Sequence, residues 1–124
     1  MERKTFTYGS DLYKVKAEVR LVGSDMLIIL SGGNKPHIGS IAAALPRPSL
    51  KNSKRTSSTA SVYNFLGHKD DVVAKKMSEA LSAKLNKKVV VTAGIHVDRI
   101  TQEGIEKVME NCDKLVHKIC KGLK

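Results

Sequence analysis

The stretch Tyr13–Leu30, which reads YKVKAEVRLVGSDMLIIL, decides the fold. From Tyr13 to Leu21 apolar and charged side chains alternate strictly, and a period of two predicts a strand with one face in the core and the other in water. Gly23-Ser24 is a two-residue turn of the Gly-first kind found in tight hairpins. The next run, Met26–Leu30, is apolar throughout, so we expect a strand that is covered on both faces.

Further strands lie on both sides of this hairpin. The cluster of turn residues Ser31–Pro36 is expected to end the second strand. Because proline lacks the backbone donor that a strand ladder needs, Pro46-Arg47-Pro48 should not continue a central strand. Residues 46–58 are therefore expected to form a connection without secondary structure. The additional strands predicted from apolar and β-branched runs are Thr5–Tyr8, Ile38–Leu45, Thr59–Leu66 and Lys88–Ala93.

Two helices complete the pattern. Acidic Asp70 and Asp71 suit the start of the first helix, apolar residues follow at helical spacing as far as Leu85, and Asn86 is its expected stop. Thr101 is the expected cap of the second helix, whose apolar stripe runs from Ile105 to Leu123. We therefore predict an α+β fold, in which a mainly antiparallel sheet has two helices packed on one face, as a single domain over residues 1–124.

Composition narrows the class of protein. The chain has 124 residues, of which 41% are hydrophobic and 27% charged, which is typical of a folded domain. Its apolar runs are shorter than the ~20 residues of a membrane span, and no secretory signal is visible, so we expect a cytoplasmic protein. Cys112 and Cys120 lack the spacing of a zinc or redox site and are expected to be buried thiols in a reducing compartment.

The charge balance favours anionic partners. Lys and Arg number 22 against 12 Asp and Glu, a formal net charge of +10. Nucleic acid is one such partner, but aromatic side chains are not interleaved with the basic residues, so it is the less favoured one. The other candidate partners are an acidic protein surface and a phosphorylated small molecule.

Polar and small residues gather in four patches at expected strand ends, at residues 31–39, 46–50, 67–71 and 94–98. The first patch can either cradle a phosphate between glycine amides and Lys35 or form a plain hairpin turn. The basic connection can grip a phosphate through Arg47 and Arg55, or simply be solvated. The spacing of the histidines does not demand a metal, and no nucleophile lies beside a base. The residues thus favour binding of an anion over catalysis.

Taken together, these patches resemble the LpdD-like prenylated-flavin chaperones, small proteins that accompany decarboxylases of aromatic acids. The most specific matching segments are Lys35–Gly39, which reads KPHIG, and Pro46–Leu50, which reads PRPSL. The segments at residues 56–62, 67–71 and 93–96 also match, and the resemblance extends from about residue 11 to about residue 120.

The resemblance implies a non-catalytic carrier. Such a protein binds reduced prenylated FMN and assists its delivery to a UbiD-type decarboxylase, with the flavin prenyltransferase as a possible second partner. It also implies a fold similar to that of proteasome assembly chaperones, and a homodimer. The residues expected to bind the cofactor are Ser31, Gly32, Gly33, Lys35, His37, Gly39, Arg47, Ser49, Arg55, Ser58, His68, Lys69 and His96. The alternatives are a protein-binding module without a small ligand and a basic nucleic-acid-binding domain.

Overall fold

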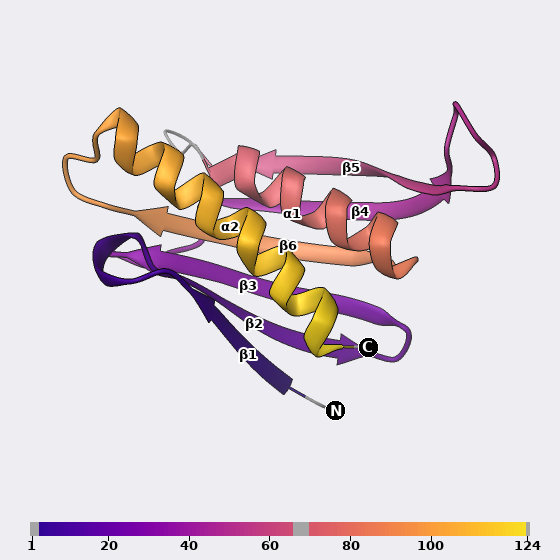
Figure 1. Ribbon diagram of the computed structural model, residues 1–124, viewed down its shortest axis with the longest axis horizontal. Coiled ribbons are helices and arrows are strands. Elements are labelled where there is room, and N and C mark those ends of the chain that lie inside the picture. Colours follow the sequence, from indigo (N-terminus) through magenta and orange to yellow (C-terminus); the bar gives the residue numbers. More distant parts are fainter. Residues whose placement is uncertain (1–2, 66–69, 124) are drawn as a thin grey trace.

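A computed structural model of the chain describes residues 3–65 and 70–123. Within these residues a six-stranded sheet has both helices on one face, as Figure 1 shows. The strands are β1 (Arg3–Tyr8), β2 (Val15–Val22), β3 (Asp25–Gly33), β4 (Ser40–Pro48), β5 (Thr56–Asn64) and β6 (Val89–His96), and the helices are α1 (Asp70–Leu85) and α2 (Gln102–Gly122). The strand order is β1-β2-β3-β6-β4-β5, with β3 and β6 parallel and the other pairs antiparallel. The predicted α+β class is confirmed.

The alternation in the deciding stretch sets the buried face of the sheet. Val15, Ala17 and Val19 are at most 1% exposed, and they face the helices together with the buried residues of β3 and β6. Tyr13 is the exception, because it belongs to a short 3-10 turn, Asp11–Tyr13, and the strand starts only at Val15. The β2–β3 hairpin closes as expected at Gly23, which has a φ of +60°.

Both helices begin where the sequence places them. Asp70 opens α1, and Asn86 with a φ of +52° follows its last residue. The Thr101 hydroxyl accepts a hydrogen bond from the Gly104 amide at 3.0 Å, which caps α2. Cys112 is buried and Cys120 half-buried on the inner face of α2, and neither is in a disulfide. No helix in the described part of the chain is long and apolar enough to cross a membrane.

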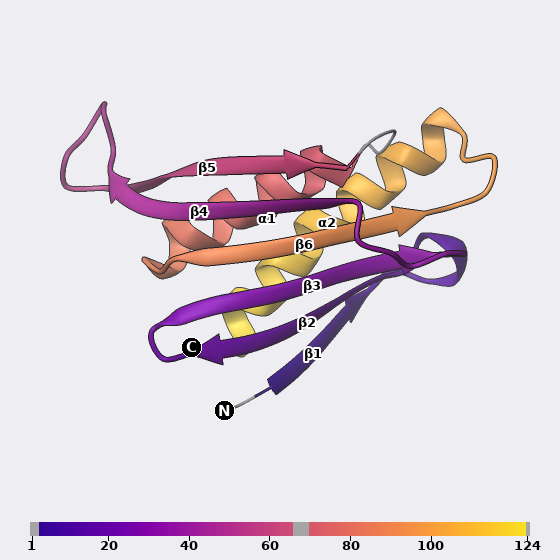
Figure 2. The same ribbon diagram turned by 180° about the vertical axis from the view of Figure 1, so that it is seen from behind.

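The sheet has one open face, and the expectation that Met26–Leu30 is covered on both faces is wrong. Met26, Ile28 and Leu30 are buried beneath the helices, whereas Ile29 on the other face is 37% exposed. Figure 2 shows this second face, which neither helix covers and which the connection from β3 to β4 crosses over β6. Leu45 on β4 and Tyr63 on β5 are exposed on the same face, and Thr92 of β6 lies between Ile29 and these two strands.

The predicted end of β3 is also wrong. Ser31, Gly32 and Gly33 do not form a turn. They are the last residues of β3, and they pair with Gly94, Ile95 and His96 of β6. Gly32 also pairs with Val15 of β2, so sheet neighbours lie on both sides of it. The glycines are needed because a Cβ at position 32 would lie 2.7 Å from the Lys14 carbonyl oxygen.

Pro46 and Pro48 lie inside β4, contrary to the prediction of an unstructured connection over residues 46–58. The ladder with β6 stops at Ala44, and beyond it β4 pairs only with β5. The Ser49 amide donates to the Arg55 carbonyl at 2.8 Å, so odd-numbered residues bond toward β5. Since the backbone hydrogen bonds of successive residues point to opposite sides of a strand, Pro46 and Pro48 face away from β5. β6 no longer runs beside β4 at this point, so no hydrogen bond of the ladder is lost. The loop shrinks to residues 49–55.

Candidate functional site

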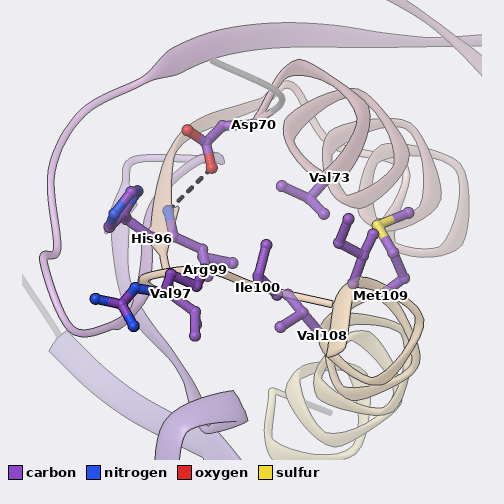
Figure 3. A pocket seen from close by; sticks show the side chains of 10 residues that line it. Asp70, Val73, His96, Val97, Arg99, Ile100, Val108 and Met109 are labelled. Atoms are coloured by element: carbon purple, nitrogen blue, oxygen red, sulfur yellow. Dashed lines mark hydrogen bonds between the residues drawn. The ribbon is translucent and has the colours of Figure 1, made fainter. Parts of the chain in front are cut away.

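A pocket opens at the end of the sheet where β6 finishes. It lies between the start of α1, the last residues of β6 and the first turns of α2, and its volume is about 380 Å³. Such a volume falls within the ~300–1,000 Å³ of small-molecule sites. Its apolar lining comprises Val73, Ile95, Val97, Ile100, Ile105, Val108 and Met109. Asp70, His96 and Arg99 supply polar groups to the same pocket, as Figure 3 shows.

Asp70 holds one side of this pocket together. Its carboxylate is buried, with 6% of the residue exposed. One oxygen, Oδ1, accepts a hydrogen bond from the Ile95 amide at 2.9 Å, and the other, Oδ2, lies 3.2 Å from Nε2 of His37. A single carboxylate thus joins the start of α1, the end of β6 and the segment that leads into β4.

Both ring nitrogens of His37 lie within hydrogen-bonding distance of an oxygen atom. Its Nδ1 lies 3.0 Å from the Lys35 carbonyl oxygen, while its Nε2 faces the Asp70 carboxylate. The ring is thus fixed between the segment that precedes β4 and the start of α1.

Two glycines make the approach of His37 possible. A Cβ at position 94 would overlap the backbone carbonyl of His37, and a Cβ at position 39 would overlap the Asp70 carboxylate. The segment before β4 therefore lies directly on β6. Because neither position has room for a methyl group, the backbone in this part of the site is tightly packed.

A second histidine–carboxylate pair stands beside the first. Nε2 of His96 lies 3.0 Å from Oδ1 of Asp98, and Nζ of Lys35 lies 3.7 Å from the same oxygen. The Asp98 amide donates to the Asn34 side chain at 2.9 Å. The His37 and His96 rings are 6.5 Å apart, edge to face. Lys35, His37, Gly39 and His96, all expected in the site, are thus brought together.

Arg47, Ser49 and Arg55 lie elsewhere, although the sequence analysis grouped them with the histidines. They flank the far end of β4, where a cavity of about 200 Å³ is lined by Arg47, Lys54, Arg55 and Asn86 among others. Seven residues of extended strand separate Ser40 from Arg47, a distance of about 23 Å at ~3.3 Å per residue. Within one subunit, Arg47 and Lys35 therefore cannot hold the same phosphate.

The remaining expected residues have other surroundings. Ser31 and Gly32 are paired within the sheet. Ser58 is buried, and its hydroxyl donates to the Glu79 carbonyl of α1 at 2.8 Å. His68 and Lys69 lie outside the described residues.

Three residues of the site were missed or misjudged from sequence. Asp70 was explained as a helix start, but its burial and two bonded partners give it a larger role. Asp98 was counted only as the last residue of the patch at residues 94–98, whereas its carboxylate pairs with His96 at 3.0 Å. Arg99 was not considered at all, and its φ of +53°, unusual for an arginine, has no sequence signal.

Metal and thiol chemistry find little support at the site. Within residues 3–65 and 70–123 no group of three or more His, Cys, Asp or Glu side chains is arranged to hold a metal ion. Burial raises the pKa of the Cys112 thiol to about 12, with a smaller contribution in the same direction from Asp113. A thiol protonated at neutral pH is a poor nucleophile.

Comparison with known proteins agrees with this architecture. The sequence model of the prenylated flavin chaperone LpdD-like domain matches residues 9–124. Protein LpdD of Lactiplantibacillus plantarum is 29% identical over 119 residues, which cover 96% of this chain and 84% of that protein. A solved chaperone complex for yeast 20S proteasome assembly contains a chain with a TM-score of 0.57 and 15% identity, covering 94% of this chain and 95% of that one. The last similarity establishes the shared fold.

Proposed function

Since this chain belongs to the prenylated flavin chaperone LpdD-like family, we propose that it is a non-catalytic carrier of reduced prenylated FMN. In this role it receives the cofactor, shields it and passes it to a UbiD-type decarboxylase of aromatic acids. The flavin prenyltransferase is the expected source of the cofactor. The chemistry that the prenylated flavin supplies is performed in the decarboxylase, so the carrier needs only to bind and release.

The observation that carries the proposal is the pocket at the end of β6. Its apolar wall, which includes Val73, Val108 and Met109, suits a flat ring system with an added hydrocarbon ring. His96 lines the pocket and is our candidate hydrogen-bonding partner for a ring or ribityl oxygen, whereas both ring nitrogens of His37 already face oxygen atoms of Lys35 and Asp70. Apolar surface and hydrogen-bonding groups thus occur side by side, as a reduced flavin requires.

We further propose that the carrier is a homodimer joined through the open face of the sheet. Ile29, Leu45 and Tyr63 on this face are 37%, 56% and 66% exposed, and Tyr63 stacks edge to face on Phe65 with ring centres 5.1 Å apart. Several large apolar side chains exposed on one sheet face are typical of a protein contact. A second copy of the chain offers the same apolar surface in return, as a two-fold interface requires.

The protein-binding alternative has an observation of its own in the basic end of the molecule. Arg47, Lys51, Lys54 and Arg55 surround the β4–β5 loop, and no acidic residue lies within residues 46–58. This end fits the acidic surface of a partner protein. It is compatible with the carrier role, because it leaves the pocket at the other end free.

A transfer assay tests the proposal. The protein loaded with reduced prenylated FMN is mixed anaerobically with apo-decarboxylase, and the recovery of decarboxylase activity is followed. Met109→Trp, which fills the pocket from α2, should abolish loading and transfer. The matched control is Glu106→Trp, an exposed position on the same helix that does not line the pocket. Equal transfer by both variants would contradict the assignment of the pocket.

A further inference from the structure

Two arginines flank concave surfaces of this molecule, and their guanidinium groups differ in availability. Arg47 is already engaged, because its Nε donates to the Thr59 hydroxyl at 2.6 Å and its Nη1 donates to the Pro48 carbonyl at 3.1 Å. These bonds tie β4 to β5. Arg99, in contrast, makes no side-chain hydrogen bond or ion pair in the part of the chain that the structure describes.

Arg99 is also placed at the pocket itself. It lies in the connection between β6 and α2, is exposed, and is one of the residues that line the pocket. Figure 3 shows its guanidinium near the His96 ring, turned away from Val73 and Met109. The apolar pocket therefore has a cationic group at its rim.

Nearby acidic groups leave the charge of Arg99 available. Asp98, its neighbour in sequence, is bonded to His96 at 3.0 Å and to Lys35 at 3.7 Å. Asp70, the carboxylate that lines the pocket, is joined to the His37 ring and the Ile95 amide. Both carboxylates thus have partners of their own, so the approach of an anion is not opposed by an unneutralised acid.

We propose that Arg99 binds the phosphate of the carried cofactor while the apolar side of the pocket receives the ring system. The assignment rests on the proposed function and replaces Arg47 as the phosphate-binding residue. A guanidinium presents planar paired donors that match two phosphate oxygens. Because Arg99 is exposed at the rim, its guanidinium is accessible to a phosphate that projects from the mouth of the pocket.

The test compares two ligands that differ only in the phosphate. Reduced prenylated FMN and prenylated riboflavin, made from it with a phosphatase, are titrated anaerobically into wild-type protein and variants. Wild-type protein should bind the phosphorylated ligand more tightly. Arg99→Ala should weaken binding of prenylated FMN by about tenfold to a hundredfold and leave prenylated riboflavin unchanged, so that the two affinities converge. Arg47→Ala should retain the full preference.

Arg99→Gly separates loss of charge from loss of structure. Glycine adopts the left-handed backbone of position 99 without strain, so this variant should be no less stable than wild type and should still lose the phosphate preference. If Arg99→Ala and Arg99→Gly keep the preference, or lose affinity for both ligands equally, the assignment of Arg99 is wrong while the carrier role stands. If wild-type protein binds neither ligand, the carrier role fails and the assignment fails with it.

Discussion

Replacing Asp70 tests whether the site is held together by its buried carboxylate. Asp70→Ala removes the acceptor of the Ile95 amide at 2.9 Å and the partner of His37 at 3.2 Å, in a residue only 6% exposed. Hydrogen bonds to a charged group contribute ~1.5–3 kcal/mol each. We expect the free energy of unfolding to fall by about 3–4 kcal/mol, out of the ~5–15 kcal/mol of a typical domain.

Asp70→Asn should cost less, about 1–2 kcal/mol, because its carbonyl oxygen can still accept from Ile95. The matched control is Asp71→Ala, which removes a second carboxylate from the same first turn of α1. The loss of its interaction with the helix dipole should cost only about 0.3–1 kcal/mol.

The free energy of unfolding of all three variants is measured by urea titration, with circular dichroism as the signal. Midpoints are compared when the dependence of the free energy on urea concentration, the m-value, is unchanged. In a domain of this size, the Asp70→Ala change corresponds to a fall in melting temperature of roughly 10–15 °C. If Asp70→Ala destabilises the protein no more than Asp71→Ala does, Asp70 is merely a helix-start residue and the reasoning is refuted.

Three further predictions concern other parts of the molecule. Gly94→Ala, whose methyl group would overlap the His37 carbonyl, should lower the free energy of unfolding by about 2 kcal/mol or more. Its control is Gly23→Ala, where the methyl group has open space. There the left-handed backbone alone should lower the free energy of unfolding, by ~1 kcal/mol. Because burial raises the pKa of Cys112 to about 12, its thiol should resist Ellman's reagent at pH 8 until the protein unfolds. The stability that the protonated Cys112 thiol contributes is fully present below pH 9 and is lost as the pH rises toward 12. Cys112→Ala should remove this part of the pH dependence of the free energy of unfolding. Ile29→Lys on the open face should yield monomers in sedimentation experiments, whereas a dimer of unchanged stability would place the interface elsewhere.

Local patterns in the sequence predict the elements of this fold well. The alternation from Val15 to Val19 identifies the buried face of β2, and Thr101 identifies the start of α2. Both signals are local, because a strand face repeats every two residues and a cap needs only the next turn. The prolines of β4 misled the prediction, since a missing donor matters only where a neighbouring strand is present, and the ladder between β4 and β6 stops at Ala44, before Pro46.

The site was only partly predictable. Residues 31–39, residues 94–98 and the start of α1 at Asp70 meet at one end of the sheet, and Lys35, His37 and His96 do converge there. Residues 46–50 lie at the far end of β4, and β4 begins directly after residues 31–39, so the two patches are at opposite ends of the strand. The roles of Asp70 and Arg99 depend on how α1, β6 and α2 meet, which is a property of the packing that no local pattern encodes.

The central claim is that the pocket between α1, β6 and α2 carries a prenylated flavin. Anaerobic titration of the purified protein with reduced prenylated FMN, followed by gel filtration, tests it most directly, with FMN as the control ligand. The account predicts that prenylated FMN co-elutes with the protein at one ligand per subunit or per dimer and is preferred over FMN, and that Met109→Trp elutes empty. Retention of neither flavin by the wild-type protein would contradict it.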